Sequence, residues 1–143
     1  MPIKIADGLA AKEKLHDEGI FTIDKGLALH QDIRPLHILI LNLMPLKKPT
    51  ELQLLRLLGD SPLQVEVDFC HTKTHQSTHT DASYLDENYC VFDDIKDRYY
   101  DGLIITGAPV EQMPFESVDY WPEMKTYLDW AKTHAFSTLL FCW

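Results

Sequence analysis

The sequence predicts an α/β fold in which helices cover both faces of a doubly wound, mainly parallel sheet. Three apolar runs lead to this prediction: Leu36–Leu43, Gly102–Thr106 and Ser137–Trp143. An apolar run of this length, bounded by turn formers, is typical of a strand that is buried on both faces. Segments with helical periodicity lie between these strands, and such alternation is typical of a parallel sheet.

Residues 1–35 precede the first strong strand and show only weak periodicity. Within them we expect a short helix over Leu9–Asp17, ended by Gly19, and a short strand over Ile20–Ile23. This lead-in segment is expected to cover the α/β domain that residues 36–143 form, and the sequence assigns no chemistry to it.

The first half of the domain predicts a β-α-β unit. A helix follows the strand Leu36–Leu43, and Thr50 and Gln53 have the spacing of a capping box at its start. Gly59 marks the end of this helix. The next segment, Gln64–Cys70, alternates apolar and acidic residues, which predicts an edge strand with one face in water.

The segment His71–Tyr89 is polar and rich in threonine, serine and histidine. His71, His75 and His79 are spaced four apart, so on a helix they would align as metal ligands. The surrounding threonine and serine residues are poor helix formers, however. A solvated loop is therefore favoured over a metal site, and Cys90, which follows, is expected to be structural.

The second half predicts another strand-helix-strand unit. The strand Gly102–Thr106 ends in a sharp loop, and the helix Val118–His134 leads to the last strand, residues 137–143. The whole order is that of a flavodoxin-like sheet, in which the carboxyl ends of the parallel strands meet at one crevice. Three loops are expected to converge there: Met44–Pro49, Gly107–Gln112 and Cys142–Trp143.

Composition limits the class of protein. Of the 143 residues, 45% are hydrophobic and 24% are charged, as in an ordinary globular domain. The net charge of -9 argues against nucleic acid or an anionic membrane surface as the main partner. Residues 1–10 lack the apolar core of a secretory signal, and no apolar run has the length that spans a bilayer. Three cysteines without such a signal predict free thiols and a cytoplasmic location.

Cys142 is the candidate nucleophile, because it directly follows a buried strand, where open α/β sheets place their chemistry. The alternative is that this cysteine only fills the core. A thiol nucleophile also needs donors for an oxyanion and a base. The loop Gly107-Ala108-Pro109-Val110 and Trp143 offer backbone N–H groups. No base is evident, since His37 lies inside a strand and His134 ends a helix.

Several short motifs extend over nearly the whole chain. They are Asn42-Leu43-Met44-Pro45, Thr50-Glu51, Gln53–Leu58, Ser61–Val65, Phe92–Ile95, Asp101–Pro109, Tyr120-Trp121-Pro122 and Phe141-Cys142-Trp143. Together they resemble the N-terminal part of the homoserine O-acyltransferases, the O-acetyltransferases and O-succinyltransferases of methionine biosynthesis. The resemblance implies a class I glutamine-amidotransferase-like fold. Because members of that family are considerably longer, it also implies that this chain is incomplete.

The resemblance further implies a mechanism. Cys142 would take an acyl group from acyl-CoA as a thioester, and the hydroxyl of L-homoserine would then accept it. The family's base histidine and glutamate lie in its second half, so this chain alone is expected to be inactive. Lys47 matches the second lysine of a family pair, whose first is replaced by Leu46, and is expected to contact substrate or CoA phosphate. Glu111 matches a position where glutamate accompanies acetyl-CoA and glycine accompanies succinyl-CoA, so acetyl-CoA is the expected donor.

The resemblance implies no cofactor and no metal, and it gives acyl-CoA and L-homoserine or L-serine as partners, with a homodimer as a further expectation. Rival classes need other features. A glutamine amidotransferase usually has glycine where Leu140 stands. A non-enzymatic receiver domain needs acidic residues after the first strand, and a flavodoxin-type binder needs a glycine-rich phosphate loop there. A serine O-acetyltransferase of the same family and a catalytically dead remnant stay open.

Overall fold

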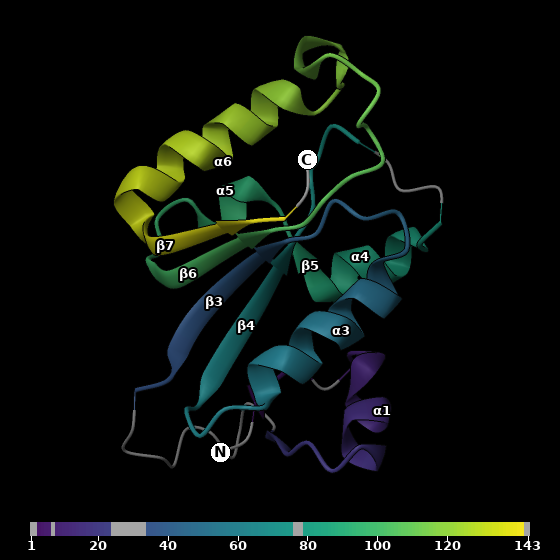
Figure 1. The fold of residues 1–143 in the computed structure, drawn as a ribbon, viewed down its shortest axis with the longest axis vertical. Helices are drawn as coiled ribbons and strands as arrows, with labels where there is room; N and C mark the ends of the chain where they lie inside the picture. The colour runs from purple at the N-terminus through teal and green to yellow at the C-terminus, as the bar shows by residue number, and fades with distance from the viewer. Residues whose placement is uncertain (1–2, 7, 24–33, 76–78, 142–143) are drawn as a thin grey trace.

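The computed structural model describes residues 3–6, 8–23, 34–75 and 79–141. Within these ranges the strands form one seven-stranded sheet with the order β2-β1-β4-β3-β6-β7, and β5 also pairs with β4. Every pairing is parallel. The strands are β1 (Ile3–Lys4), β2 (Thr22–Ile23), β3 (Leu36–Leu41), β4 (Val65–Cys70), β5 (Tyr89–Cys90), β6 (Tyr100–Ile105) and β7 (Ala135–Leu140). This arrangement confirms the predicted α/β, flavodoxin-like class (Figure 1).

Helices cover both faces of the sheet, with α1, α3 and α4 on one side and α5 and α6 on the other (Figure 1). Their bounds are α1 (Ala11–Asp17), α3 (Lys47–Gly59), α4 (Ala82–Asn88), α5 (Phe92–Ile95) and α6 (Trp121–His134). Each layer encloses its own core. Ile40 and Leu55 belong to the first core and Leu39 and Tyr127 to the second, because successive residues of β3 point to opposite faces. None of the described helices has the length and apolar character that crossing a bilayer demands.

The unit β3-α3-β4 has the predicted order, but its helix begins earlier than expected. α3 starts at Lys47, so Thr50 lies within its first turn, and the Thr50 hydroxyl donates to the Leu46 carbonyl at 3.1 Å. The predicted capping box is therefore wrong. The helix ends at Gly59, where an added Cβ atom would lie 2.7 Å from Ile20 Cγ2. A glycine here lets the end of the helix approach the N-terminal segment closely.

The prediction that Gln64–Cys70 forms an edge strand is wrong, because β4 lies between β3 and the short strands β1 and β5. Its acidic side chains are accommodated by partners from the adjacent strand β1 and from β6, which lies beyond β3. Lys4 donates to Glu66 at 2.9 Å, and the Tyr100 hydroxyl donates to Asp68 at 2.8 Å. These pairings allow charged side chains to stand in the interior of the sheet.

The predicted solvated loop over residues 71–89 contains the helix α4, which leads directly into β5, and is wrong to that extent. Leu85 of α4 is buried and belongs to the same core as α3. The Tyr84 hydroxyl also donates to Glu51 of α3 at 2.7 Å. These contacts with α3 outweigh the weak helix propensity of the segment.

The described part of residues 1–35 adds two strands to the sheet, because β1 pairs with both β2 and β4. The expected short helix is present as α1, and close to its end Gly19 has a φ of 74°, a left-handed conformation that suits glycine. β2 falls within the predicted strand. The division of the chain at residue 35 stays a prediction.

The helix α6 leads into the last strand. It begins at Trp121 instead of Val118, because a 3-10 turn over Phe115–Ser117 comes before it. Pro122 occupies its first turn, as predicted.

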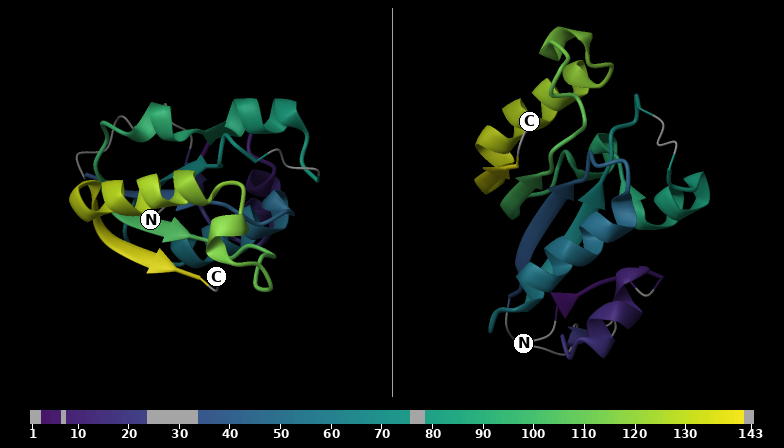
Figure 2. Two further views of the ribbon diagram at one scale, coloured as in Figure 1. Left: turned by 90° about the horizontal axis from the view of Figure 1, so that it is seen from above. Right: turned by 45° about the vertical axis from the view of Figure 1, so that its right-hand side comes forward.

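The last strand runs from Ala135 to Leu140 rather than over residues 137–143, and it is not buried on both faces. β7 lies at the margin of the sheet, next to β6 (Figure 2). Phe136 is 93% exposed and Leu140 is 60% exposed. The prediction took the apolar composition of this strand as a sign of burial, but among the described residues no element covers its outer side.

Candidate functional site

The carboxyl ends of β3 and β6 lead into loops that line one cavity of about 370 Å³. Met44 and Pro45 come from the loop after β3, Lys47 is the first residue of α3, and Pro109 and Val110 come from the loop after β6. The structure thus brings together two of the three loops expected at the crevice. The third, Cys142–Trp143, lies outside the described residues, as do the predicted nucleophile and one predicted N–H donor.

Lys47 opens α3 and is only 6% exposed. Its ammonium group donates to the carbonyls of Asn42 at 2.7 Å and of Met44 at 3.3 Å. Burial lowers the pKa of Lys47 to about 8, and the nearby Glu51 carboxylate acts in the opposite direction. Lys47 is therefore mostly protonated at neutral pH and provides a positive charge at the wall of the cavity. Its contact with substrate or CoA stays a prediction.

Lys47 belongs to a buried polar cluster, whose other members are Asn42, Glu51 and Tyr89. The Tyr89 hydroxyl donates to Glu51 at 2.6 Å, and the side-chain amide of Asn42 donates to the Tyr89 oxygen at 3.0 Å. Burial and the Glu51 carboxylate raise the pKa of Tyr89 well above its usual range. The sequence analysis assigned no role to Glu51. The spacing of Lys47 and Glu51, four residues apart on one helix, is the signal that could have found it.

The loop after β6 holds the remaining described candidates. The Val110 N–H donates to the Ala108 carbonyl at 2.8 Å, so it is already engaged within the loop. Among the described residues, the N–H groups of Gly107 and Ala108 have no hydrogen-bond partner. Of the predicted oxyanion donors in this loop, these two remain available. Glu111 is exposed and does not line the cavity, although its neighbour Val110 does, and its role stays a prediction.

A histidine–aspartate pair also lines the cavity. His75 Nδ1 lies 2.9 Å from Asp119 Oδ2, and the His75 ring packs edge-on against Tyr120. The sequence analysis missed this pair because its members are 44 residues apart. His71 and His75 are not on a helix, and no cluster of three or more His, Cys, Asp or Glu side chains suited to a metal occurs in the described part of the chain. The side chains of His75 and Asp119 are both about half exposed to solvent.

The chain is similar in sequence to acyltransferases along its whole length. The sequence model of the family "Homoserine O-succinyltransferase" matches residues 2–143. A homoserine O-acetyltransferase of Agathobacter rectalis is 58% identical over 143 residues, which are 100% of this chain and 46% of the relative. Those of Streptococcus thermophilus and Acetivibrio thermocellus are 54% and 57% identical over all of this chain and over 46% and 47% of their own lengths. The chain thus spans about half the length of the curated relatives it matches, and it belongs to the homoserine O-succinyltransferase family of acyltransferases.

Proposed function

We propose that the complete protein transfers an acyl group from acyl-CoA to the hydroxyl of L-homoserine, through a thioester on Cys142, as a step of methionine biosynthesis. The observation that carries the proposal is the family match over residues 2–143. It is supported by relatives that bear the name homoserine O-acetyltransferase. Those names describe proteins of which this chain spans about half, so the activity is proposed for the complete protein.

The first half-reaction loads the enzyme. The Cys142 thiolate attacks the thioester carbonyl of acyl-CoA, a new carbon–sulfur bond forms, and the carbonyl oxygen becomes an oxyanion. The N–H groups of Gly107 and Ala108 are the proposed donors for that oxyanion, with the N–H of Trp143 as a third. When the oxyanion collapses, the bond to the CoA sulfur breaks, and CoA leaves as a thiol after taking a proton.

The second half-reaction releases the product. The homoserine hydroxyl gives up its proton to a base and attacks the thioester carbonyl, and the Cys142 thiol leaves with a proton. The base is expected from the remainder of the complete protein. The Lys47 ammonium, fixed by two carbonyls, is the proposed contact for the carboxylate of the amino acid or for a CoA phosphate.

Acylation of the full-length protein tests this proposal. Incubation with acetyl-CoA and no acceptor is expected to add one acetyl group, lost to hydroxylamine, on the peptide that contains Cys142. Cys142→Ser should abolish it, and Cys90→Ser should retain it as a matched control. Adding L-homoserine should discharge the thioester faster than adding L-serine; the opposite order would favour the serine O-acetyltransferase alternative. An acetyl group that persists in Cys142→Ser and is lost to neutral hydroxylamine, as a thioester is and an oxygen ester is not, would contradict the mechanism.

The isolated 143-residue chain is expected to show no steady turnover, because the base is proposed to lie in the remainder of the complete protein. Incubation with acetyl-CoA and homoserine, followed by CoA release, measures this. Turnover comparable to that of a full-length relative would contradict it and would place the base within this chain. His75, paired with Asp119, would then be the candidate.

The acyl donor is proposed to be acetyl-CoA, on the basis of Glu111. An ionised Glu111 beside the acyl group would repel the distal carboxylate of succinyl-CoA. Two like charges ~4 Å apart at an effective dielectric of ~20 cost about 4 kcal/mol before screening. Half of that corresponds to more than about tenfold in selectivity. We expect Glu111→Gly to shift the ratio of kcat/KM values toward succinyl-CoA in the full-length enzyme, and Glu116→Gly, on the same exposed segment, to leave it unchanged.

A further inference from the structure

Two cysteines outside the proposed catalytic site stand in contact. Cys70 is the last residue of β4 and Cys90 the last residue of β5, and the two are register partners in the parallel pairing of these strands. Their Sγ atoms lie 2.9 Å apart. Neighbouring strands are about 4.8 Å apart, which falls within the Cα separations that a disulfide bridges. Little movement therefore separates the two thiols from a covalent bond.

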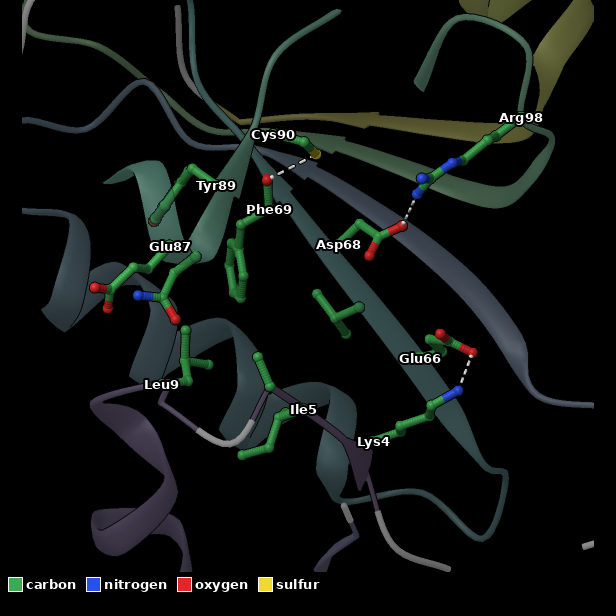
Figure 3. Close-up of a pocket in the computed structure, with 13 residues that line it drawn as sticks. Lys4, Ile5, Leu9, Glu66, Asp68, Phe69, Glu87, Tyr89, Cys90 and Arg98 are labelled. Atoms are coloured by element: carbon green, nitrogen blue, oxygen red, sulfur yellow. Dashed lines mark hydrogen bonds and ion pairs between the residues drawn. The ribbon is translucent and has the colours of Figure 1, made fainter. Parts of the chain in front are cut away.

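The two thiols differ in access. Cys70 is fully buried, whereas Cys90 is partly exposed and lines a cavity of about 200 Å³ beside β4 (Figure 3). The Cys90 thiol also donates to the Phe69 carbonyl at 3.1 Å. A small molecule that enters this cavity meets Cys90 first, and Cys70 lies directly behind it.

Charged side chains of both signs line this cavity, Lys4 and Arg98 together with Glu66, Asp68 and Glu87. Arg98 lines the same cavity, where its guanidinium group pairs with Asp68 at 3.4 Å (Figure 3). The pKa of Cys70 is raised far above its usual range by the hydrogen bond with Cys90 and by burial. Because Cys90 lines the cavity and Cys70 is buried, a two-step order follows in which Cys90 reacts first and Cys70 second.

We propose that Cys70 and Cys90 form a site of reversible oxidation, at which a hydroperoxide converts the two thiols into a disulfide. In the first step the Cys90 sulfur attacks the terminal oxygen of the hydroperoxide and the O–O bond breaks. The leaving oxygen takes the proton of the Cys90 thiol and departs as water or an alcohol, and Cys90 becomes a sulfenic acid. In the second step the Cys70 sulfur attacks Cys90 Sγ, and the sulfenic hydroxyl leaves as water with the Cys70 proton. Two thiols are oxidised and one hydroperoxide is reduced.

The fold gives this oxidation local consequences. β5 consists of two residues, so Cys90 can approach Cys70 without moving a long strand. The residue before Cys90 is Tyr89, whose hydroxyl holds Glu51 in the buried polar cluster. The His71 N–H donates to the Cys90 carbonyl at 3.1 Å. This hydrogen bond attaches Cys90 to the start of the segment that carries His75. A covalent link between Cys70 and Cys90 would join β4 to β5, the strand whose Tyr89 belongs to the buried polar cluster beside the proposed catalytic cavity.

Peptide mapping of the full-length protein tests the proposal, independently of its acyltransferase activity. The protein is treated with hydrogen peroxide, its remaining thiols are blocked with iodoacetamide, and it is digested with trypsin. Cleavage after Arg56, Lys73 and Lys96 places Cys70 in peptide 57–73 and Cys90 in peptide 74–96. We expect these two peptides to appear joined, and to separate after treatment with dithiothreitol. Separate, alkylated peptides after peroxide treatment, or a link from Cys90 to Cys142, would overturn the proposal.

Single substitutions test the order of the steps. In Cys70→Ser, Cys90 should stop at the sulfenic acid and react with dimedone, while in Cys90→Ser, Cys70 should remain a thiol. Cys142→Ser should retain the link between the two peptides. If Cys70→Ser does not fold, the wild-type protein trapped with dimedone at early times supplies the same readout. Labelling that starts on Cys70 would contradict the proposed order.

Discussion

The buried polar cluster and the strand β7 invert the usual relation between residue type and burial. Glu51 and Asn42 are fully buried, and Lys47 is nearly so, whereas Phe136 of β7 is 93% exposed. The difference lies in the partners available to each region. Every charged or amide group of the cluster has hydrogen-bond partners from the loop after β3, from α3 or from β5. The side chains of β7, in contrast, are left uncovered by the described part of the chain.

The comparison teaches that each inversion carries information of a different kind. A satisfied polar cluster in the interior fixes the position of one functional group, here the ammonium of Lys47, at the cost of removing charges from water. An uncovered apolar strand marks a surface that another segment or molecule is needed to bury. Composition alone would have placed these two regions the other way round.

The largest expected effect comes from removing the carboxylate at the centre of the cluster. Glu51→Leu leaves the hydroxyls of Tyr84 and Tyr89 without an acceptor and removes the negative charge near Lys47. We expect the free energy of unfolding to fall by about 3 to 5 kcal/mol, as measured by urea titration of the full-length protein. Glu13→Leu, on an exposed position of α1, is the matched control and should change it by less than about 0.5 kcal/mol. Equal losses in the two variants would show that the cluster is not special.

The next effect concerns the pH dependence of stability. The pKa of Lys47 is lowered from 10.5 to about 8, so between these values the unfolded chain binds more protons than the folded chain. Burial of the charged ammonium group lowers the free energy of unfolding below about pH 8. As the pH rises and Lys47 loses its proton in the folded state, this loss is recovered, by about 2 kcal/mol at about pH 9.5.

Comparison of variants isolates this contribution. The raised pKa values of Cys70 and the tyrosines oppose it, but they are common to all the variants. The free energy of unfolding of wild type minus that of Lys47→Met should rise between about pH 7 and about pH 9.5. Lys48→Met, at the exposed next position of the same helix, is the matched control for the loss of a lysine. A flat difference for Lys47→Met would mean that Lys47 keeps its ordinary pKa.

The smallest change in stability is expected on β7, where the readout is association. The isolated chain should elute from size-exclusion chromatography as oligomers, because an uncovered apolar strand at a sheet margin promotes self-association. Phe136→Lys together with Leu139→Lys should shift it toward monomer, with a change in unfolding free energy below about 1 kcal/mol. Leu57→Lys, which replaces a leucine of α3 that is 71% exposed, is the control and should not. A parent chain that is a clean monomer would contradict this interpretation of β7.

Local pattern was sufficient for the strands and helices that bury a continuous apolar face. The runs around Leu39 and Leu103 predicted β3 and β6, and the proline at position 122 placed the first turn of α6. The alternation of apolar and acidic residues in β4 suggested an edge strand. The strand is in fact interior, because its acidic side chains have partners that the local sequence does not reveal. Lys4, which pairs with Glu66, is 62 residues away in the sequence.

The candidate site was predictable to the same degree. The loops after β3 and β6 could be assigned to one sheet edge from topology alone, and Lys47 was singled out by its position in a motif. The pairing of His75 with Asp119 could not be, because it depends on how two long connections pack. The helix α4 was missed for a similar reason. Its stability depends on contacts of Tyr84 and Leu85 with the core around α3, and not on the helix propensity of its own residues.

The position of β1 has a consequence for biosynthesis. Ile3 pairs with Thr22 on one side and with Val65 on the other, so the N-terminal strand is an interior strand of the finished sheet. On the ribosome β1 is made before both of its partners, and the 62 residues that separate Lys4 from Glu66 must be added before the β4 side of the pairing exists. At about 5 to 20 residues per second, this takes roughly 3 to 12 s. β1 can therefore pair with β2 early in synthesis, but it can join the rest of the sheet only after β4 has been made.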